Sequence, residues 1–166
     1  YYQINAIKSI QEAIANKKNR FLFEMATGTG KTLTAAGVIK LFIRSEVANR
    51  VLFLVDRLEL ENQAKKDLTK YLSKDGIKVA VYKENKDVWI KADVVISTIQ
   101  SFSIDNKYRK LFKPSDFDLV ISDEAHRVLG ASNRAIFEYF IGYKLGLTAT
   151  PKNYLKGVDF DDDDPR

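Results

Sequence analysis

The sequence predicts an α/β fold in which helices cover both faces of a parallel β-sheet. Short runs of Val, Ile, Leu and Phe recur along the chain, and helical patterns separate several of them. Some runs are apolar almost throughout, as expected of strands that are covered on both faces. Strands that alternate with helices form parallel sheets through right-handed crossovers. The predicted strands are residues 21–24, 51–55, 79–82, 93–97, 118–122 and 144–148.

The predicted helices are segments in which apolar residues recur every three or four positions. One follows the first strand, at residues 31–44, and another precedes the last strand, at residues 133–141. In the segment 58–72, the apolar positions are Leu60, Ala64, Leu68 and Leu72. The first 14 residues place four isoleucines on one helical face, namely Ile4, Ile7, Ile10 and Ile14.

The charge of the chain is unevenly distributed. The 166 residues suit one domain, and their formal net charge is +5. Residues 159–166 contain five Asp and one Arg, so the rest of the chain has 26 basic and 17 acidic residues, a net charge of +9. A basic domain suits a polyanionic partner, although a solvated lysine-rich surface would give the same composition.

The composition excludes several classes of protein. The chain has no cysteine, which excludes a disulfide framework and a thiolate metal site. Its single histidine makes a histidine-based zinc site unfavourable. No apolar run approaches the length needed to span a bilayer, and no signal peptide is evident. We therefore expect a cytoplasmic protein.

Residues 25–32, MATGTGKT, fit most of a phosphate-binding loop of the pattern G-x-x-x-x-G-K-[ST]. Met25 stands where the first glycine of the pattern is expected. The stretch lies between a predicted strand and a predicted helix, which is the context that such a loop requires. The expected nucleotide contacts are Thr27, Gly28, Thr29, Gly30, Lys31 and Thr32.

Each part of this loop has a chemical role. Gly28 and Gly30 allow the backbone to turn tightly and point N–H groups at phosphate oxygens. Lys31 can reach the β and γ phosphates, and the Thr32 hydroxyl can hold Mg²⁺. Met25 precedes the phosphate-binding part and need not contact the ligand. A Gly- and Thr-rich turn without a ligand is the alternative interpretation.

An acidic pair follows the fifth predicted strand, in the sequence Asp123-Glu124-Ala125-His126. The carboxyl end of a buried parallel strand is where such sheets bind ligands. Asp123 is expected to hold Mg²⁺, and Glu124 to polarise the attacking water. Kinases transfer phosphate to an acceptor and need no such glutamate, so the pair favours hydrolysis. Acidic residues at a helix N-terminus are the alternative interpretation.

Thr148 and Thr150, in the sequence TATP, follow the last predicted strand. Their hydroxyls are expected near Asp123 if the fifth and sixth strands are neighbours. The motif alone is weak, because such sequences are common in loops.

Taken in order, MATGTGKT, LVDRLELENQ, STIQSF, DEAH and TATP resemble the first motor domain of a superfamily 2 helicase. The closer resemblance is to the restriction (R) subunit of type I restriction enzymes, with type III enzymes next. It is carried by YYQINAI, FLVDRLELENQA, ISDEAHR and the segment from FEYFIGYKLGLTATP to the end. The resemblance implies a RecA-like phosphate-loop NTPase that uses ATP and Mg²⁺ to move along double-stranded DNA.

The resemblance also implies roles for further residues. Gln3 matches the glutamine that contacts adenine, with Tyr2 as a possible stacking neighbour. His126, Thr148 and Thr150 match residues that couple hydrolysis to movement. Two motifs that touch the nucleic-acid backbone, Ia and Ib, match Arg57, Gln63, Ser97, Thr98 and Gln100. Without the resemblance, Arg57 is a surface charge and the segment 97–100 is a helix cap.

Residues 1–151 are expected to form the first RecA-like motor domain, and residues 152–166 an acidic segment that leads to a second one. A type I restriction enzyme would also supply a nuclease domain in the same chain and separate methyltransferase and specificity subunits. The arginine finger of the second motor domain completes such ATP sites, and its loss lowers rates by about 10³–10⁵ in related systems. We therefore expect these 166 residues to bind nucleotide better than they hydrolyse it, and to lack a nuclease site.

Other functions remain open at this point. Within the same class, the domain could belong to another superfamily 2 DNA or RNA helicase. A phosphate-loop kinase is disfavoured by Glu124. A non-catalytic module that has kept the fold is disfavoured by the intact Lys31, Thr32, Asp123 and Glu124.

Overall fold

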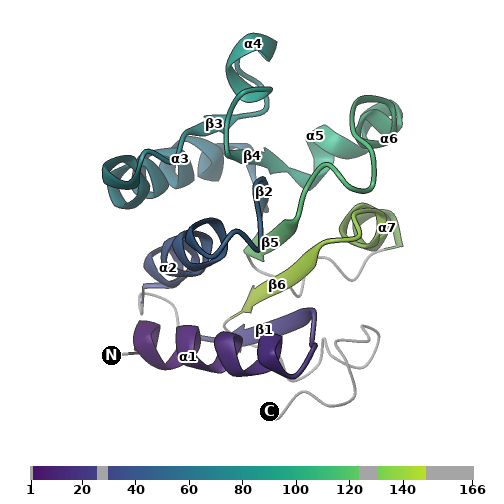
Figure 1. Cartoon of the computed structure of the whole chain (residues 1–166). Helices are drawn as coiled ribbons and strands as arrows, with labels where there is room; N and C mark the ends of the chain where they lie inside the picture. The colour runs from purple at the N-terminus through teal and green to yellow at the C-terminus, as the bar shows by residue number, and fades with distance from the viewer. Residues whose placement is uncertain (1, 26–29, 124–130, 149–166) are drawn as a thin grey trace.

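The computed structural model describes residues 2–25, 30–123 and 131–148 (Figure 1). Its strands are β1 (Arg20–Glu24), β2 (Val51–Val55), β3 (Val79–Val81), β4 (Val94–Thr98), β5 (Leu119–Asp123) and β6 (Tyr143–Thr148). Its α-helices are α1 (Tyr2–Ala15), α2 (Lys31–Arg44), α3 (Leu58–Leu72), α4 (Lys86–Trp89), α5 (Ile99–Ser103), α6 (Lys107–Leu111) and α7 (Ala131–Tyr139). Two short 3₁₀ turns are η1 (Ser73–Asp75) and η2 (Ile104–Asn106).

The six described strands form one sheet in the order β1-β6-β5-β2-β4-β3, and every neighbouring pair is parallel. The predicted parallel α/β fold is therefore confirmed, and each predicted strand is present to within one residue at either end. Because all strands run the same way, the sheet has one edge where strands begin and one where they end. We call these the amino edge and the carboxyl edge.

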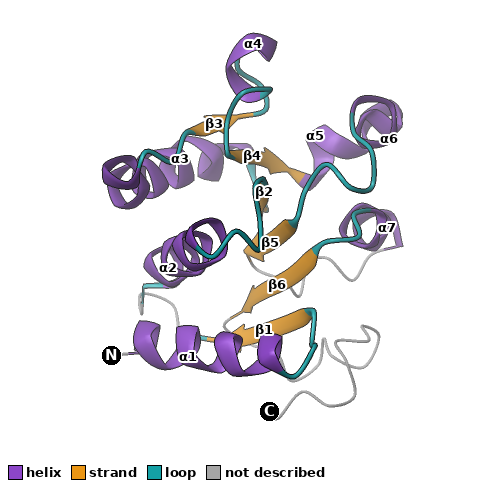
Figure 2. Cartoon of the chain, in the orientation of Figure 1, coloured by secondary structure: helices purple, strands orange, loops and turns teal. Residues whose placement is uncertain are grey.

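Helices cover both faces of the sheet (Figures 1 and 2). The two-residue period of β2 sends Val51, Phe53 and Val55 into a core with α1, α2 and α3. It sends Leu52 and Leu54 into a second core with α4 to α7. Each fully buried side chain of this kind stabilises the fold by roughly 1.5–3 kcal/mol relative to an exposed one.

The short helices α4, α5 and α6 were not among the predicted elements, and α7 begins and ends two residues before the predicted segment 133–141. Aromatic side chains hold the short helices to the sheet. Tyr82 at the end of β3 packs against Trp89 of α4 and Phe102 of α5, with ring centroids 5.2 and 4.9 Å apart. Tertiary packing thus stabilises helices that are too short to be stable alone.

Within the described part of the chain, no helix is long and apolar enough to cross a membrane. The predicted acidic segment 152–166 lies outside the described residues, as does the end of the predicted motor domain.

Candidate nucleotide and nucleic-acid site

The backbone of β1 continues into the phosphate loop. The Met25 N–H donates to the carbonyl of Thr148 at 2.9 Å, one residue beyond the end of β1. The Met25 side chain is only 7% exposed. The residue that replaces the first glycine of the loop pattern is therefore an extra strand position with its side chain in the interior. Thr27, Gly28 and Thr29 lie outside the described residues.

Gly30 forms the junction between the loop and α2. It adopts the left-handed conformation, with φ 84° and ψ 41°, and its carbonyl accepts the Thr34 N–H at 2.9 Å. A side chain is strained at this φ, so the position favours glycine. The helix that starts at Lys31 directs its first N–H groups and its partial positive charge toward the carboxyl edge, which suits a phosphate.

Lys31 and Asp123 face each other across the carboxyl edge. The distance from Lys31 Nζ to Asp123 Oδ1 is 3.6 Å, and the two side chains are 14% and 24% exposed. The register explains this approach, because Glu24 lies opposite Thr148 and Asp123 opposite Leu147. The strands β1, β6 and β5 therefore end at nearly the same level, which brings together residues 92 positions apart in the sequence.

This set of donors fits a magnesium–nucleotide complex. Lys31 supplies a positive charge for phosphate oxygens, and the Thr32 hydroxyl and Asp123 carboxylate are oxygen ligands of the kind Mg²⁺ prefers. Among the described residues, no three His, Cys, Asp or Glu side chains form a complete metal-binding group. Mg²⁺ commonly completes its shell with water and substrate phosphates, so two protein oxygens are a suitable number.

Thr148 lies close to this pair. It is the last residue of β6 and is 1% exposed. Thr148 is expected near Asp123 if the fifth and sixth strands are neighbours. The strands β5 and β6 are neighbours, with Asp123 opposite Leu147. Glu124, His126 and Thr150 lie outside the described residues, so their roles stay predictions.

Gln3 lies in the first turn of α1, and its side chain is outside the described part of the structure. The helix α1 packs closely on α2. A Cβ atom at Gly37 would lie 2.7 Å from Cδ1 of Ile7, so the glycine permits this approach. Gln3 is thus one turn before a residue that packs on the phosphate-loop helix, and its adenine contact stays a prediction.

The candidate residues of motif Ia lie at the start of α3. Arg57 directly precedes this helix with an extended backbone, and its side chain is 68% exposed, 3.5 Å from Asp56 Oδ2. Gln63 is exposed, and its amide donates to the Asp67 carboxylate one turn later at 3.0 Å. Of the two, Arg57 is better placed to meet a phosphate.

The candidate residues of motif Ib differ in exposure. Ser97 and Thr98 are buried, whereas Gln100 is exposed. The Ser97 hydroxyl donates to the Thr98 carbonyl at 2.9 Å. The Thr98 hydroxyl caps α5 by accepting the Ser101 N–H at 3.0 Å, which confirms the helix-cap interpretation. A nucleic-acid contact through these two side chains would require their hydroxyls to leave existing bonds.

One buried group at this edge does not stand out in the sequence. Glu61 of α3 is 1% exposed. It occurs among polar neighbours in LELENQ, where a glutamate suggests a solvated helix face. Counting back from Leu68 and Ala64 by helical spacing would have placed it on the inner face.

A protein-family model described as "Type III restriction enzyme, res subunit" matches residues 1–153. The chain belongs to this family. It is similar to the "Type I restriction enzyme EcoAI endonuclease subunit" of Escherichia coli, with 36% identity over 159 residues. That match covers 92% of this chain and 19% of the relative, so the chain spans about one fifth of the relative's length.

Solved structures show the same fold. The domain superposes on the "Sulfolobus solfataricus SWI2/SNF2 ATPase core in complex with dsDNA" with a TM-score of 0.76 and 18% identity, covering 95% of this chain and 33% of that one. It superposes on the nuclease-deletion mutant of the Type ISP restriction-modification enzyme LlaGI, in complex with a DNA substrate mimic, with a TM-score of 0.72 and 24% identity. This second match covers 98% of this chain and 18% of that one. The expected RecA-like motor-domain fold and the resemblance to type I R subunits are thus confirmed.

Proposed function

We propose that this domain binds MgATP at the carboxyl edge and uses its hydrolysis to move along double-stranded DNA, as the motor of a type I restriction enzyme R subunit. The observation that carries the proposal is the Lys31–Asp123 pair, 3.6 Å apart at the ends of α2 and β5. The family match supports the restriction-enzyme assignment.

Different residues of the chain are assigned to phosphate binding, magnesium binding, hydrolysis and coupling to movement. Gly30 and the first turn of α2 bind phosphate oxygens, and Lys31 neutralises negative charge that develops during transfer. Thr32 and Asp123 would hold Mg²⁺, which when bound neutralises and orients the β and γ phosphates. Glu124 orients and polarises the attacking water, and Gln3 contacts adenine. His126, Thr148 and Thr150 link the nucleotide site to movement.

The proposed nucleic-acid track lies along the same edge. Arg57, Gln63 and Gln100 are its exposed members, and Ser97 and Thr98 are buried. Contacts to phosphates bind without regard to base sequence, as a translocating motor requires. The proposed partners are duplex DNA, a second RecA-like domain, a nuclease domain, and methyltransferase and specificity subunits. Another superfamily 2 DNA or RNA helicase is the alternative.

Nucleotide titration tests the phosphate site. Lys31→Ala should weaken binding of a fluorescent ATP analogue in the presence of Mg²⁺ by about 10–100-fold, because it removes a charge-assisted hydrogen bond worth roughly 1.5–3 kcal/mol. Lys40→Ala is the control, since Lys40 lies in the same helix but pairs with Asp75 at the amino edge. Equal affinity of the wild type and Lys31→Ala would remove the site assignment.

Turnover in the full-length protein tests Glu124. Glu124→Gln should keep ATP binding and lose hydrolysis, because the amide cannot accept the proton of the attacking water. A variant that hydrolyses ATP near the wild-type rate would show that Glu124 is not the base.

DNA binding by the full-length protein tests the track. Arg57→Ala should weaken binding of unrelated duplexes about equally and reduce the log–log salt slope by about 0.9. Nucleotide affinity should stay nearly unchanged. Duplex RNA is the comparison, and a strong preference for RNA would favour the RNA-helicase alternative.

A further inference from the structure

The inner face of α3 contains one charged residue. The buried residues of this helix are Glu61, Ala64, Leu68 and Leu72, spaced as one helical face against the sheet. A carboxylate that is 1% exposed loses most of its hydration, which costs several kcal/mol unless a partner offsets it. Glu61 therefore requires a cation at the carboxyl edge.

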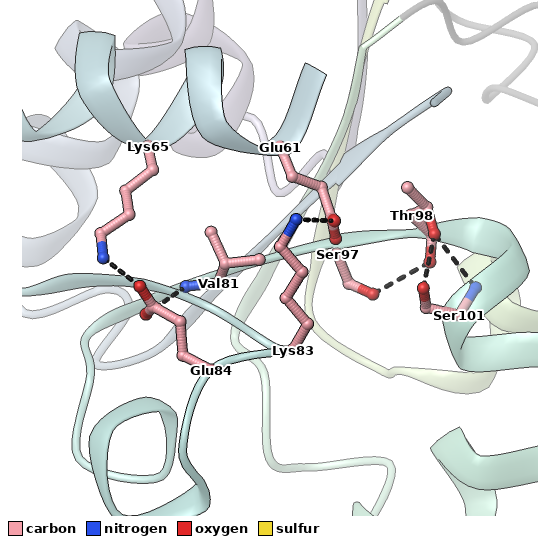
Figure 3. Close-up of polar contacts among 8 residues, drawn as sticks. All are labelled: Glu61, Lys65, Val81, Lys83, Glu84, Ser97, Thr98 and Ser101. Atoms are coloured by element: carbon pink, nitrogen blue, oxygen red, sulfur yellow. Dashed lines mark hydrogen bonds and ion pairs between the residues drawn. The ribbon is translucent and has the colours of Figure 1, made fainter. Parts of the chain in front are cut away.

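Lys83 supplies that cation. Its Nζ lies 3.4 Å from Glu61 Oε1, and Figure 3 shows the ammonium extending to the carboxylate from the opposite side. Within the described part of the chain, neither carboxylate oxygen of Glu61 has a hydrogen bond, so the ion pair with Lys83 offsets the lost hydration. Lys83 itself is 48% exposed, and an ammonium has three N–H donors. Part of its donor capacity therefore faces solvent.

The turn that holds Lys83 is fixed at both ends. The Glu84 N–H donates to the Val81 carbonyl at 2.9 Å, and the Glu84 carboxylate accepts the Val81 N–H at 3.0 Å. Lys65 of α3 pairs with the same carboxylate. These contacts anchor the turn to β3 and to α3 (Figure 3), so the position of Lys83 is determined by the fold.

The sheet order places Lys83 beside the proposed track. The strands β2, β4 and β3 are consecutive neighbours, with Val55 opposite Thr98 and Val81 opposite Ile96. The Tyr82 N–H extends the ladder by donating to the Ile96 carbonyl at 2.8 Å. Arg57 follows the end of β2 by two residues, and Lys83 follows the end of β3 by two residues. Both cations thus lie at the carboxyl edge, on either side of β4.

We propose that Lys83 is a phosphate-contact residue of the duplex-DNA track and that Glu61 is its positioning residue. The inference rests on the proposed function, which it extends by one strand, from β2 and β4 to β3. Glu61 holds the ammonium at the edge, and the solvent-facing donors of Lys83 meet a backbone phosphate. The contact is independent of base sequence, as are the other proposed contacts of the track.

The salt dependence of duplex-DNA binding by the full-length protein tests this proposal. Lys83→Gln should reduce the log–log salt slope by about 0.9, the effect of one lost phosphate contact, to the same extent on two unrelated duplexes. Lys83→Arg should keep the wild-type slope, because it keeps the charge. Lys40→Gln is the matched control: Lys40 is 35% exposed and lies 3.1 Å from the Asp75 carboxylate, but at the amino edge. Its slope should equal that of the wild type.

The double variant Glu61→Gln/Lys83→Gln distinguishes the loss of a phosphate contact from a folding defect. Lys83→Gln alone leaves a buried carboxylate without its cation, whereas the double variant removes both charges and should fold with the same reduced slope. A wild-type slope in the double variant, or an equal reduction in Lys40→Gln, would overturn the assignment of Lys83 and leave the proposed function in place. A wild-type protein that does not bind duplex DNA would overturn both.

Discussion

The two edges of the sheet use charged side chains in different ways. At the amino edge, Asp75 pairs with the side chain of Lys40, but two other carboxylates bind fixed backbone donors. Asp118 accepts the N–H groups of Asn49 and Arg50 at 2.8 and 3.1 Å, and Asp93 accepts that of Lys78 at 2.8 Å. Each carboxylate lies just before one strand and binds the residues just before the neighbouring strand. These bonds therefore tie adjacent strands together.

At the carboxyl edge, opposite charges approach without closing to hydrogen-bond length. The pairs Lys31–Asp123, Lys83–Glu61 and Arg57–Asp56 lie 3.6, 3.4 and 3.5 Å apart. The hydrogen-bonded Lys65–Glu84 pair is an exception and belongs to the turn after β3. The difference indicates that charges at the amino edge stabilise the fold, whereas cations at the carboxyl edge can also contact phosphates.

Of the carboxylates that bind backbone donors at the amino edge, Asp118 should cause the largest loss of stability when it is changed to Ala, because it accepts two N–H groups and Asp93 accepts one. Removal of a carboxylate that accepts two backbone N–H groups should lower the free energy of unfolding by roughly 2–3 kcal/mol. Asp118→Asn should lose less, because its amide oxygen can still accept. Urea unfolding measures both, and nucleotide affinity of the folded protein should not change. A smaller loss of stability in Asp118→Ala than in Asp118→Asn would contradict a structural role for the Asp118 carboxylate.

The next effect concerns Lys144, which is 3% exposed and donates to the carbonyls of Phe140 and Gly142. Burial, and secondarily the charge of Arg20, lower the pKa of Lys144 to about 8, while Glu138 opposes them. The ammonium group of Lys144 therefore holds its proton more tightly in the unfolded chain than in the folded protein. The contribution of Lys144 to the free energy of unfolding must rise with pH between about 8 and 10.5.

Lys144→Met removes this dependence. Relative to that variant, the wild type should gain about 2 kcal/mol of stability between pH 7 and pH 10. Urea unfolding of both proteins at the two pH values provides the measurement, and the comparison cancels the titration of other groups. If the difference in the free energy of unfolding between the two proteins is the same at both pH values, folding does not lower the pKa of Lys144.

A smaller effect is expected from Thr98→Ala at the carboxyl edge. Loss of the α5 cap should lower the free energy of unfolding by about 1 kcal/mol. Thr98→Ser should restore most of it. Because the hydroxyl already binds Ser101, the affinity for duplex DNA at a fixed salt concentration should be unchanged in both variants. A loss of DNA affinity in Thr98→Ala that Thr98→Ser restores would show that the hydroxyl contacts a phosphate.

The smallest change in stability is expected from Lys31→Ala, although its effect on nucleotide binding is large. A partly exposed pair at 3.6 Å contributes less than about 1 kcal/mol. Thermal unfolding without nucleotide measures this change. A loss as large as that of Asp118→Ala would remove the distinction between the two edges.

The strands could be predicted from the sequence because they are buried on both faces and therefore almost wholly apolar. The phosphate loop could be predicted because Gly30, Lys31 and Thr32 are local in sequence. The helices α4, α5 and α6 could not, because four or five residues are too few to show a helical period. The Glu61–Lys83 pair could not be predicted for another reason: its members are 22 positions apart, and only strand order brings them together.

The turn after β3 also determines what can join the sheet. The strand β3 has only three residues and forms one border of the described sheet. A free border strand offers backbone N–H groups to any extended peptide, which is a common route to aggregation. The Glu84 carboxylate already occupies the N–H of Val81, and Lys65 neutralises that carboxylate. A segment that added a strand here would have to displace a charged side chain, so the same turn that presents Lys83 also protects the domain from self-association through this border.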